Sequence, residues 1–393
     1  MAIVVSGSSG SLNRAELSQT PGGAVMTGSQ ALIFDGKELN AANTKRWSTA
    51  GTGTATYAAN NSTLTVTTGQ FLIKQSTTPM PYFSGYTAYT ELTFDGFEPQ
   101  TGVVKRAGYF SSAASPALNT ALDGFWLESS GGTYHIKVYN AGTEIASVPF
   151  SDWYGRAELG DVDFTNFSVI MFDFLWLGGA ALRMWVAHPT RGFVLAHAVP
   201  YPASRKGTIT KSPQQFVRYD ISASGGGGAM RPICAQYSPL GGTDNKSTFR
   251  TQVATAAIAC NSVGTTYALM GVKRNATYRD VPVKLASVGA VTGSVNDTGI
   301  LMLLKNPTLS AAITYAPVGK VDFGFATTQT VTAIGTVINA TPTTQTGETP
   351  DIDNYEAWFT QSAADVFDEY VLAFSPVTTN QSRYGILTWK EFG

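Results

Sequence analysis

The feature that most limits the fold of this chain is a succession of short segments in which apolar and polar residues alternate. Residues 63–67 alternate at every position, which places Leu64 and Val66 on one face of an extended segment. Similar segments, separated by turn residues such as Asp, Asn and Gly, follow at residues 86–94, 103–110, 125–127, 134–138 and 144–150. Strands of this length and spacing are typical of an all-β sandwich.

Residues 167–177 (FSVIMFDFLWL) are apolar nearly throughout and end at Gly178 and Gly179. A helix fits the length, but the β-branched and aromatic content and the glycine stop favour a central strand covered on both faces. We expect residues 181–186 to be its hairpin partner and residues 192–199 to form the next strand.

A carboxylate, Asp173, interrupts this apolar segment. Because an unpaired buried carboxylate is costly, Asp173 needs a partner, and Arg106 and Arg183 are the candidates. Trp176 of the same segment is expected to be buried in the core, where its removal would be expensive.

Changes in composition divide the chain into three parts. Residues 1–30 are rich in Gly, Ser and Thr, which fits either a disordered terminus or an extended arm that orders on a neighbouring subunit. The glycine run at residues 225–228 fits either a turn or a domain boundary, and we favour a boundary because fewer aromatic residues follow it. We therefore expect an N-terminal arm over residues 1–30, a β-sandwich over residues 31–224 and a second β-sandwich over residues 225–393.

The second β-sandwich repeats the strand pattern with more Ala, Thr and Val. Its expected strands are residues 267–272, 281–288, 300–304, 320–325 and 330–337. Residues 363–370 (AADVFDEY) form the one segment of this half with a helical pattern.

The charge of the chain limits its partners. Charged residues make up 13% of the sequence, which is about half the usual share. Hydroxyl and amide side chains take their place, and these are cheaper to desolvate in protein contacts than ions are. The net charge is −1 and no run of Lys or Arg occurs, so we expect no binding to nucleic acid or to an anionic membrane. No stretch reaches the ~18 apolar residues of a membrane helix, and no signal peptide is recognised, so we expect synthesis in a cytoplasm.

Cysteine and histidine offer little for metal binding. Cys234 and Cys260 have no His or Cys near them in sequence and are expected to be buried free thiols. His135, His188 and His197 fit packing or surface positions better than a zinc site, and we expect no metal ligands among them.

The best pair of carboxylates for glycoside hydrolysis is Asp161 and Asp163 in GDVDF, which would share a face if extended. Their place just before an apolar segment is more typical of a solvated turn. The acidic residues 351–356 lack the spacing of a Ca²⁺ loop. No nucleophile elbow or phosphate loop is present, so we assign no catalytic, cofactor-binding or metal-binding residue and expect neither an enzyme nor a cofactor.

Several tryptophans accompany the strands of the first half. They are Trp126, Trp153, Trp176 and Trp185. Most such residues belong to a core, while one or two could form a platform on which a sugar stacks.

A series of spaced motifs gives a resemblance to a known family. The motifs are KRAGYF at residues 105–110, DGFWL at 123–127, VPFSDW at 148–153, LGDVDF at 159–164, IMFDFLWLG at 170–178, VRYDI at 217–221 and MRPICA at 230–235. This succession resembles a family of structural proteins of tailed bacteriophages, often labelled fibre-like or minor virion proteins. The resemblance covers residues 31–245, with an echo at residues 387–391. It implies a jelly-roll first domain of the legume-lectin kind and carries over no catalytic residue.

These observations favour a structural component of a bacteriophage virion, either a capsid-decorating subunit or a tail or fibre subunit. It would act through assembly with other virion proteins, as a homo-oligomer, and would reside in the virion after synthesis in the host cytoplasm. The alternative is a glycan-binding adhesin, or receptor-binding protein, that contacts a host surface glycan. A glycoside hydrolase or lyase is the third possibility, disfavoured because no paired-carboxylate motif is present.

Overall fold

The computed structural model describes residues 32–392 of the chain with short gaps, which are residues 38–40, 45, 59–60, 84–85, 114–115, 161, 177–181, 200–206, 240–246, 279–280, 293–297, 344–357 and 360–366. The chain divides into two compact units, Met1–Thr243 and Asp244–Gly393. The expected N-terminal arm, residues 1–30, and the acidic residues 351–356 lie outside the described residues.

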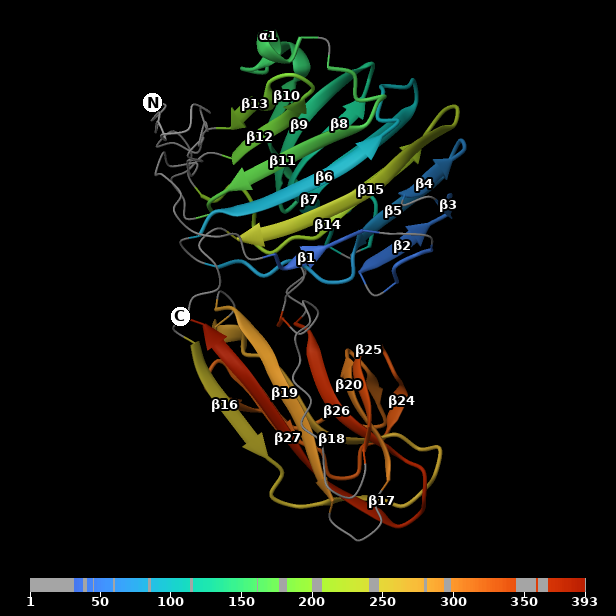
Figure 1. Cartoon of the computed structure of the whole chain (residues 1–393), viewed down its shortest axis with the longest axis vertical. Coiled ribbons are helices and arrows are strands. Elements are labelled where there is room, and N and C mark those ends of the chain that lie inside the picture. The colour runs from blue at the N-terminus through green and yellow to red at the C-terminus, as the bar shows by residue number, and fades with distance from the viewer. Residues whose placement is uncertain are drawn as a thin grey trace, which may run out of the picture. The chain divides into compact units, whose positions relative to one another are not determined.

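The first unit consists of two antiparallel sheets (Figure 1). In order across the sheet, the eight-stranded sheet contains β13 (Gly192–Val199), β12 (Leu182–His188), β11 (Ser168–Phe174), β6 (Ala88–Asp95), β15 (Gly228–Pro239), β4 (Asn61–Val66) and β3 (Thr54–Ala58), and β1 (Phe34–Asp35) pairs with β15. The seven-stranded sheet contains β10 (Thr143–Pro149), β9 (Thr133–Asn140), β8 (Asp123–Ser130), β7 (Val103–Ser111), β14 (Val217–Ala223), β5 (Phe71–Ser76) and β2 (Trp47–Gly51). A 3-10 helix, η1 (Phe150–Asp152), and a short helix, α1 (Arg156–Leu159), follow β10.

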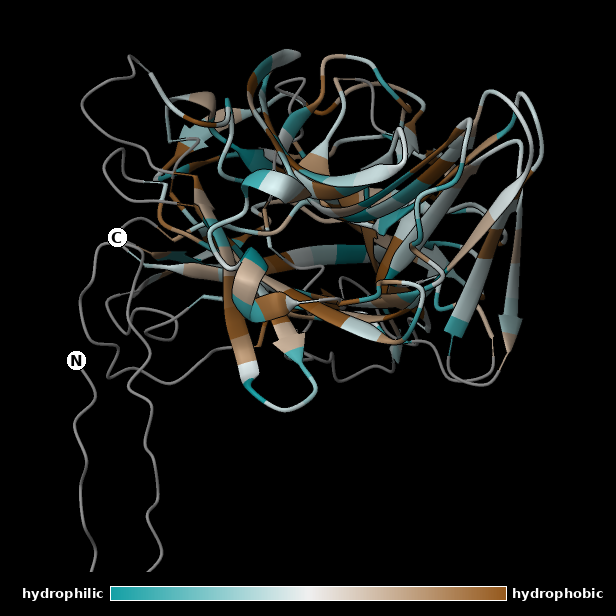
Figure 2. Cartoon of the chain, turned by 90° about the horizontal axis from the view of Figure 1, so that it is seen from above, coloured by the Kyte–Doolittle hydropathy of each residue, from teal (hydrophilic) through white to brown (hydrophobic). Residues whose placement is uncertain are grey.

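Aromatic side chains join the two sheets of this unit. Tyr109 of β7 stacks on Tyr237 of β15, with ring centroids 5.5 Å apart, and Phe125 of β8 lies 5.2 Å from Phe172 of β11. All four side chains are buried. The two inner faces therefore form one core, which is the arrangement of a β-sandwich. Hydrophobic and hydrophilic residues follow one another along many of the strands (Figure 2), because successive side chains of a strand point to opposite faces.

The strand predictions for the first unit are confirmed, with ends that shift by a few residues. The predicted strand at residues 192–199 is β13, and β12 is the hairpin partner of β11, with Ile170 opposite Val186. The prediction that β11 is covered on both faces is correct for only one of them. Ile170, Phe172 and Phe174 of one face are buried in the core, whereas Val169 and Met171 of the other face are half-buried and Asp173 on that face is buried in an ion pair. One face of an antiparallel sheet can be partly open to water.

The glycine run at residues 225–228 is a connection inside the first unit, so the domain boundary expected there needs correction. It carries the chain from β14 of one sheet to β15 of the other. Ser224 and Gly225 donate backbone hydrogen bonds to the Gly102 carbonyl, and a Cβ at Gly102 would collide with the Gly225 backbone. Glycine at this point therefore allows the two chain segments to cross in close contact. The second unit begins only at Asp244.

The second unit is also a pair of facing sheets. One sheet contains β16 (Ser247–Val253), β27 (Gln381–Phe392), β17 (Ile258–Cys260) and β19 (Val283–Thr292), and the other contains β22 (Ala316–Val318), β23 (Val321–Phe325), β18 (Tyr267–Arg274), β26 (Glu369–Pro376), β20 (Gly299–Lys305) and β25 (Thr336–Thr343). A small sheet joins β21 (Thr308–Leu309) to β24 (Val331–Ala333), and a 3-10 helix, η2 (Ala276–Tyr278), follows β18. Trp389 of β27 stacks on Phe323 of β23 between the sheets, with centroids 5.9 Å apart.

The helix expected at residues 363–370 is wrong in the part that the structure describes. Glu369 and Tyr370 begin β26, which pairs with β18 on one side and β20 on the other. Strand pairing on both sides outweighs the weak helical preference of so short a segment. Within the described residues, no helix is long and apolar enough to cross a membrane.

Candidate binding surface on the seven-stranded sheet

The outward face of the seven-stranded sheet carries charged side chains in neighbouring strands. Alternation along β7 directs Ala107 and Tyr109 into the core, so Arg106 faces outward. The strand register places Arg106 opposite Glu128 of β8 on one side and Asp220 of β14 on the other. Side chains directly opposite one another on one face of a sheet are close enough to interact.

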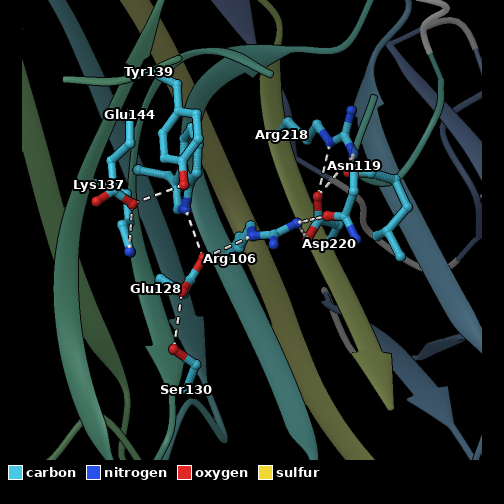
Figure 3. A network of polar contacts seen from close by, with 11 residues as sticks. Arg106, Asn119, Glu128, Ser130, Lys137, Tyr139, Glu144, Arg218 and Asp220 are labelled. Atoms are coloured by element: carbon cyan, nitrogen blue, oxygen red, sulfur yellow. Dashed lines mark hydrogen bonds and ion pairs between the residues drawn. The ribbon is translucent and has the colours of Figure 1, made fainter. Parts of the chain in front are cut away.

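These residues and Arg218 form a network that we call the buried network (Figure 3). Arg106 Nε donates to Glu128 Oε2 at 2.9 Å, and Arg106 Nη1 lies 3.6 Å from Asp220 Oδ1. Arg218 Nη2 donates to Asp220 Oδ2 at 2.8 Å, and both of these side chains are fully buried. Burial raises the pKa of Glu128, but Arg106 outweighs this effect and the pKa lies below its ordinary value.

A loop covers part of this network. Arg106 Nη1 donates to Asn119 Oδ1 at 2.8 Å, and Arg218 Nη2 donates to the Ala117 carbonyl at 3.0 Å. Leu122 at the end of the loop packs with Phe110 and Trp126 in a small apolar cluster. The outward face therefore has a core of its own at this point, and the charged groups there hold the loop in place.

The uncovered part of the face lies towards β9 and β10. Tyr139 of β9 stacks on Trp126, with centroids 5.0 Å apart and planes 29° apart. The Tyr139 hydroxyl donates to Glu144 Oε2 at 2.8 Å, and Lys137 Nζ lies 2.9 Å from the same oxygen. The Glu144 side chain is 43% exposed, and Lys137 and Tyr139 are half-buried. We call these three residues, with His135, the Tyr139 patch.

The charges of the Tyr139 patch are balanced. Hydrogen bonds from Lys137 and Tyr139 lower the pKa of Glu144, which keeps it ionised. Burial and the hydrogen bond to Glu144 raise the pKa of Tyr139 to about 12. Burial, and next the charge of Lys137, lower the pKa of His135, and its Nδ1 has no hydrogen-bond partner among the described residues.

Of the two carboxylates considered for hydrolysis in the sequence, Asp161 and Asp163, only Asp163 has a described position. Asp161 lies outside the described residues. Asp163 is exposed in a turn before β11, where its carboxylate accepts from Thr165 N at 2.9 Å and from Asn166 Nδ2 at 3.2 Å. Its position agrees with the interpretation as a solvated turn residue.

The histidines do not come together. His135 belongs to the seven-stranded sheet, whereas His188 and His197 lie on β12 and β13 of the other sheet. His188 is opposite Gly192 and His197 is opposite Met184, so the two are separated along the strands. Among the residues with described positions, no three His, Cys, Asp or Glu side chains form a group that could hold a metal ion.

The remaining predictions concern cysteines and tryptophans. Cys234 and Cys260 are both free thiols, of which Cys260 is buried and Cys234 is half-buried. Trp126 is buried, while Trp176 is half-buried against expectation. The sequence did not single out Tyr139, although the alternation of residues 134–138 extends to it and could have placed it on the face of His135 and Lys137.

A scan against protein-family models and a search of curated proteins found no match for this chain. Solved structures similar to it include the carbohydrate recognition domain of Emp47p, at 12% identity and a TM-score of 0.35, covering 53% of this chain and 96% of that one. A lectin from Bauhinia forficata in complex with GalNAc is similar over 54% of this chain and 99% of its own, at 13% identity and a TM-score of 0.34. A carbohydrate esterase from the Shiga toxin-encoding bacteriophage phi24B is similar over 53% of this chain and 99% of its own, at 10% identity and a TM-score of 0.32.

Proposed function

We propose that this chain is a component of a bacteriophage virion and that its first unit binds a glycan of the host surface at the Tyr139 patch. The observation that carries the glycan-binding part is the position of Tyr139, a half-buried aromatic ring whose hydroxyl shares the Glu144 carboxylate with the Lys137 ammonium group. A sugar offers an apolar C–H face and a rim of hydroxyls. An aromatic ring with polar neighbours complements both.

The patch is held in place before any ligand arrives. Trp126 supports the Tyr139 ring, and Glu144 fixes its hydroxyl. Trp126 Nε1 in turn donates to Glu128 Oε2 at 3.2 Å, and Arg106 Nε donates to the same oxygen at 2.9 Å. A fixed set of side chains loses little conformational entropy on binding, which favours recognition of a weakly held ligand such as a sugar.

We propose binding without hydrolysis. A general acid for glycoside cleavage must keep its proton near the working pH, which requires a raised pKa. Glu144 of the patch and Glu128, which supports it through Trp126, both have a pKa below the ordinary value, because Lys137 and Tyr139 hydrogen-bond to the first and Arg106 pairs with the second. Such carboxylates suit structural support better than proton donation.

The proposed virion location and homo-oligomeric assembly are supported by the sequence and not by the Tyr139 patch. The sequence resemblance to tailed-phage structural proteins favours the virion, with other virion proteins as partners. The low share of charged residues, 13%, favours protein–protein contacts over a fully hydrated surface. Cryo-electron microscopy of the particle, with this chain located in the density, tests this part, and particles without it would contradict it.

Incubation of the purified chain with host surface polysaccharide tests the glycan-binding part. We expect retention of the chain on the polysaccharide without new reducing ends or unsaturated sugars. Product formation would contradict the proposal of a binding protein and favour a depolymerase. A chain that does not bind at all would contradict glycan binding and leave assembly as its function.

A further inference from the structure

The charged groups on the outward face of the seven-stranded sheet pair within the sheet. Lys137 is paired with Glu144, and Arg106 lies between Glu128 and Asp220. Arg218 shares Asp220 and is fully buried. Each of these basic side chains therefore already has a carboxylate within ion-pair distance.

This pairing bears on the charge of a ligand. An acidic sugar, such as a sialic acid or a uronate, is commonly bound by a cation that can turn towards its carboxylate. At the Tyr139 patch the accessible cation is Lys137, whose Nζ is 2.9 Å from Glu144. An acidic sugar would have to compete with Glu144 for Lys137 and would lie beside a like charge.

A neutral sugar meets no such cost. Both hydrogen bonds that Glu144 accepts from Lys137 and Tyr139 reach Oε2. A carboxylate offers about four acceptor positions, so Oε1 of Glu144 can accept from sugar hydroxyls. The half-buried imidazole of His135 adds no charge at neutral pH, because burial lowers its pKa, and its Nδ1 atom is itself buried.

We infer that the Tyr139 patch selects neutral glycans and discriminates against acidic ones, an inference that rests on the proposed glycan-binding function. The selecting element is the Lys137–Glu144 pair beside the Tyr139 ring. Removal of the carboxylate should free the lysine and shift the selectivity towards acidic sugars.

Titration of the full chain with lactose-type neutral oligosaccharides and their sialylated counterparts tests this inference. We expect the neutral member of each pair to bind about tenfold more tightly, a difference near 1.4 kcal/mol, with little dependence on salt. In Glu144→Gln this ratio should fall or reverse, and the acidic member should become salt-sensitive. Urea unfolding of the variant checks that its fold is kept.

The outcomes separate the inference from the proposed function. Tighter binding of the acidic member by the unaltered chain would overturn the inference and leave glycan binding intact. An unchanged neutral-to-acidic ratio in folded Glu144→Gln would also overturn it. No binding to any member of a wide panel, neutral or acidic, would instead overturn the proposed function itself.

Discussion

Asp173 and Arg183 lie directly opposite each other on β11 and β12, and the guanidinium contacts both carboxylate oxygens. Arg183 Nε donates to Oδ1 at 2.8 Å, and Nη2 donates to Oδ2 at 2.6 Å. Trp185 Nε1 also donates to Oδ2 at 3.1 Å. The carboxylate that interrupts an apolar strand is thus satisfied by its own hairpin, and Arg183 is the partner predicted from the sequence. The other candidate, Arg106, belongs to the opposite sheet.

Arg183→Met should destabilise the first unit by about 3–5 kcal/mol, because it leaves a carboxylate with 1% exposure without its cation. The matched control is Arg231→Met, which removes a 52% exposed arginine from Asp95 and should cost about 0–1 kcal/mol. Urea unfolding of both variants measures the two free energies. Equal losses would show that burial of the Asp173 pair has no energetic role.

Trp126→Ala should cost about 3–5 kcal/mol, since the indole is 1% exposed and packs against Phe110 and Leu122. Trp176→Ala should cost less, because Trp176 is only half-buried and lies beyond the end of β11. The same unfolding experiment ranks the two variants. A larger loss for Trp176 would contradict the role assigned to the outward-face cluster.

Glu128 should contribute a pH-dependent part of the stability. Its pKa in the fold lies below the ordinary value of 4.5, chiefly because Arg106 outweighs the effect of burial. A carboxyl with a lowered folded pKa contributes its full stability above the unfolded pKa and loses it as the pH falls through the folded value. The free energy of unfolding should therefore drop below about pH 4.5.

The slope of this decline tests the role of Glu128. Glu128→Gln should flatten it, whereas Glu158→Gln, at an exposed position of α1, should leave it unchanged. Urea unfolding at a series of acidic pH values gives the slopes. Identical slopes in the two variants would mean that Glu128 is not linked to stability through Arg106.

The purified chain should sediment as a homo-oligomer at micromolar concentration. The low share of charged residues, 13%, favours contact between copies. Analytical ultracentrifugation over a range of concentrations measures the mass. A monomer throughout that range would contradict self-association of the isolated chain.

Local alternation made most strands predictable. Segments such as β4 and β13 carry their pattern within a few residues, and the β11–β12 hairpin joins neighbours in the sequence. The position of β15 was not predictable in this way. It pairs with β6, which is far away in the chain. The glycine run before β15 has the same sequence pattern whether it connects two sheets of one domain or two domains.

The candidate site was not predictable from sequence for the same reason. Arg106, Glu128 and Asp220 lie on three strands that are distant in sequence, and only the strand register makes them neighbours. Tyr139 and Glu144 are close in sequence, but whether a tyrosine is covered or open depends on the loop that packs beside it. By contrast, Asp161 and Asp163 were considered as a carboxylate pair only because they are close in the sequence.

Glycan binding at the Tyr139 patch is tested most directly by the affinity of Tyr139 variants for a neutral glycan or host polysaccharide that binds the unaltered chain. Tyr139→Ala removes the ring and should weaken binding at least about tenfold, a loss of roughly 1.4 kcal/mol or more. Tyr139→Phe keeps the ring and should retain more of the affinity. Tyr278→Ala, which removes an exposed tyrosine of the second unit, should bind as the unaltered chain does. Full affinity in folded Tyr139→Ala would contradict the account and place any glycan site elsewhere.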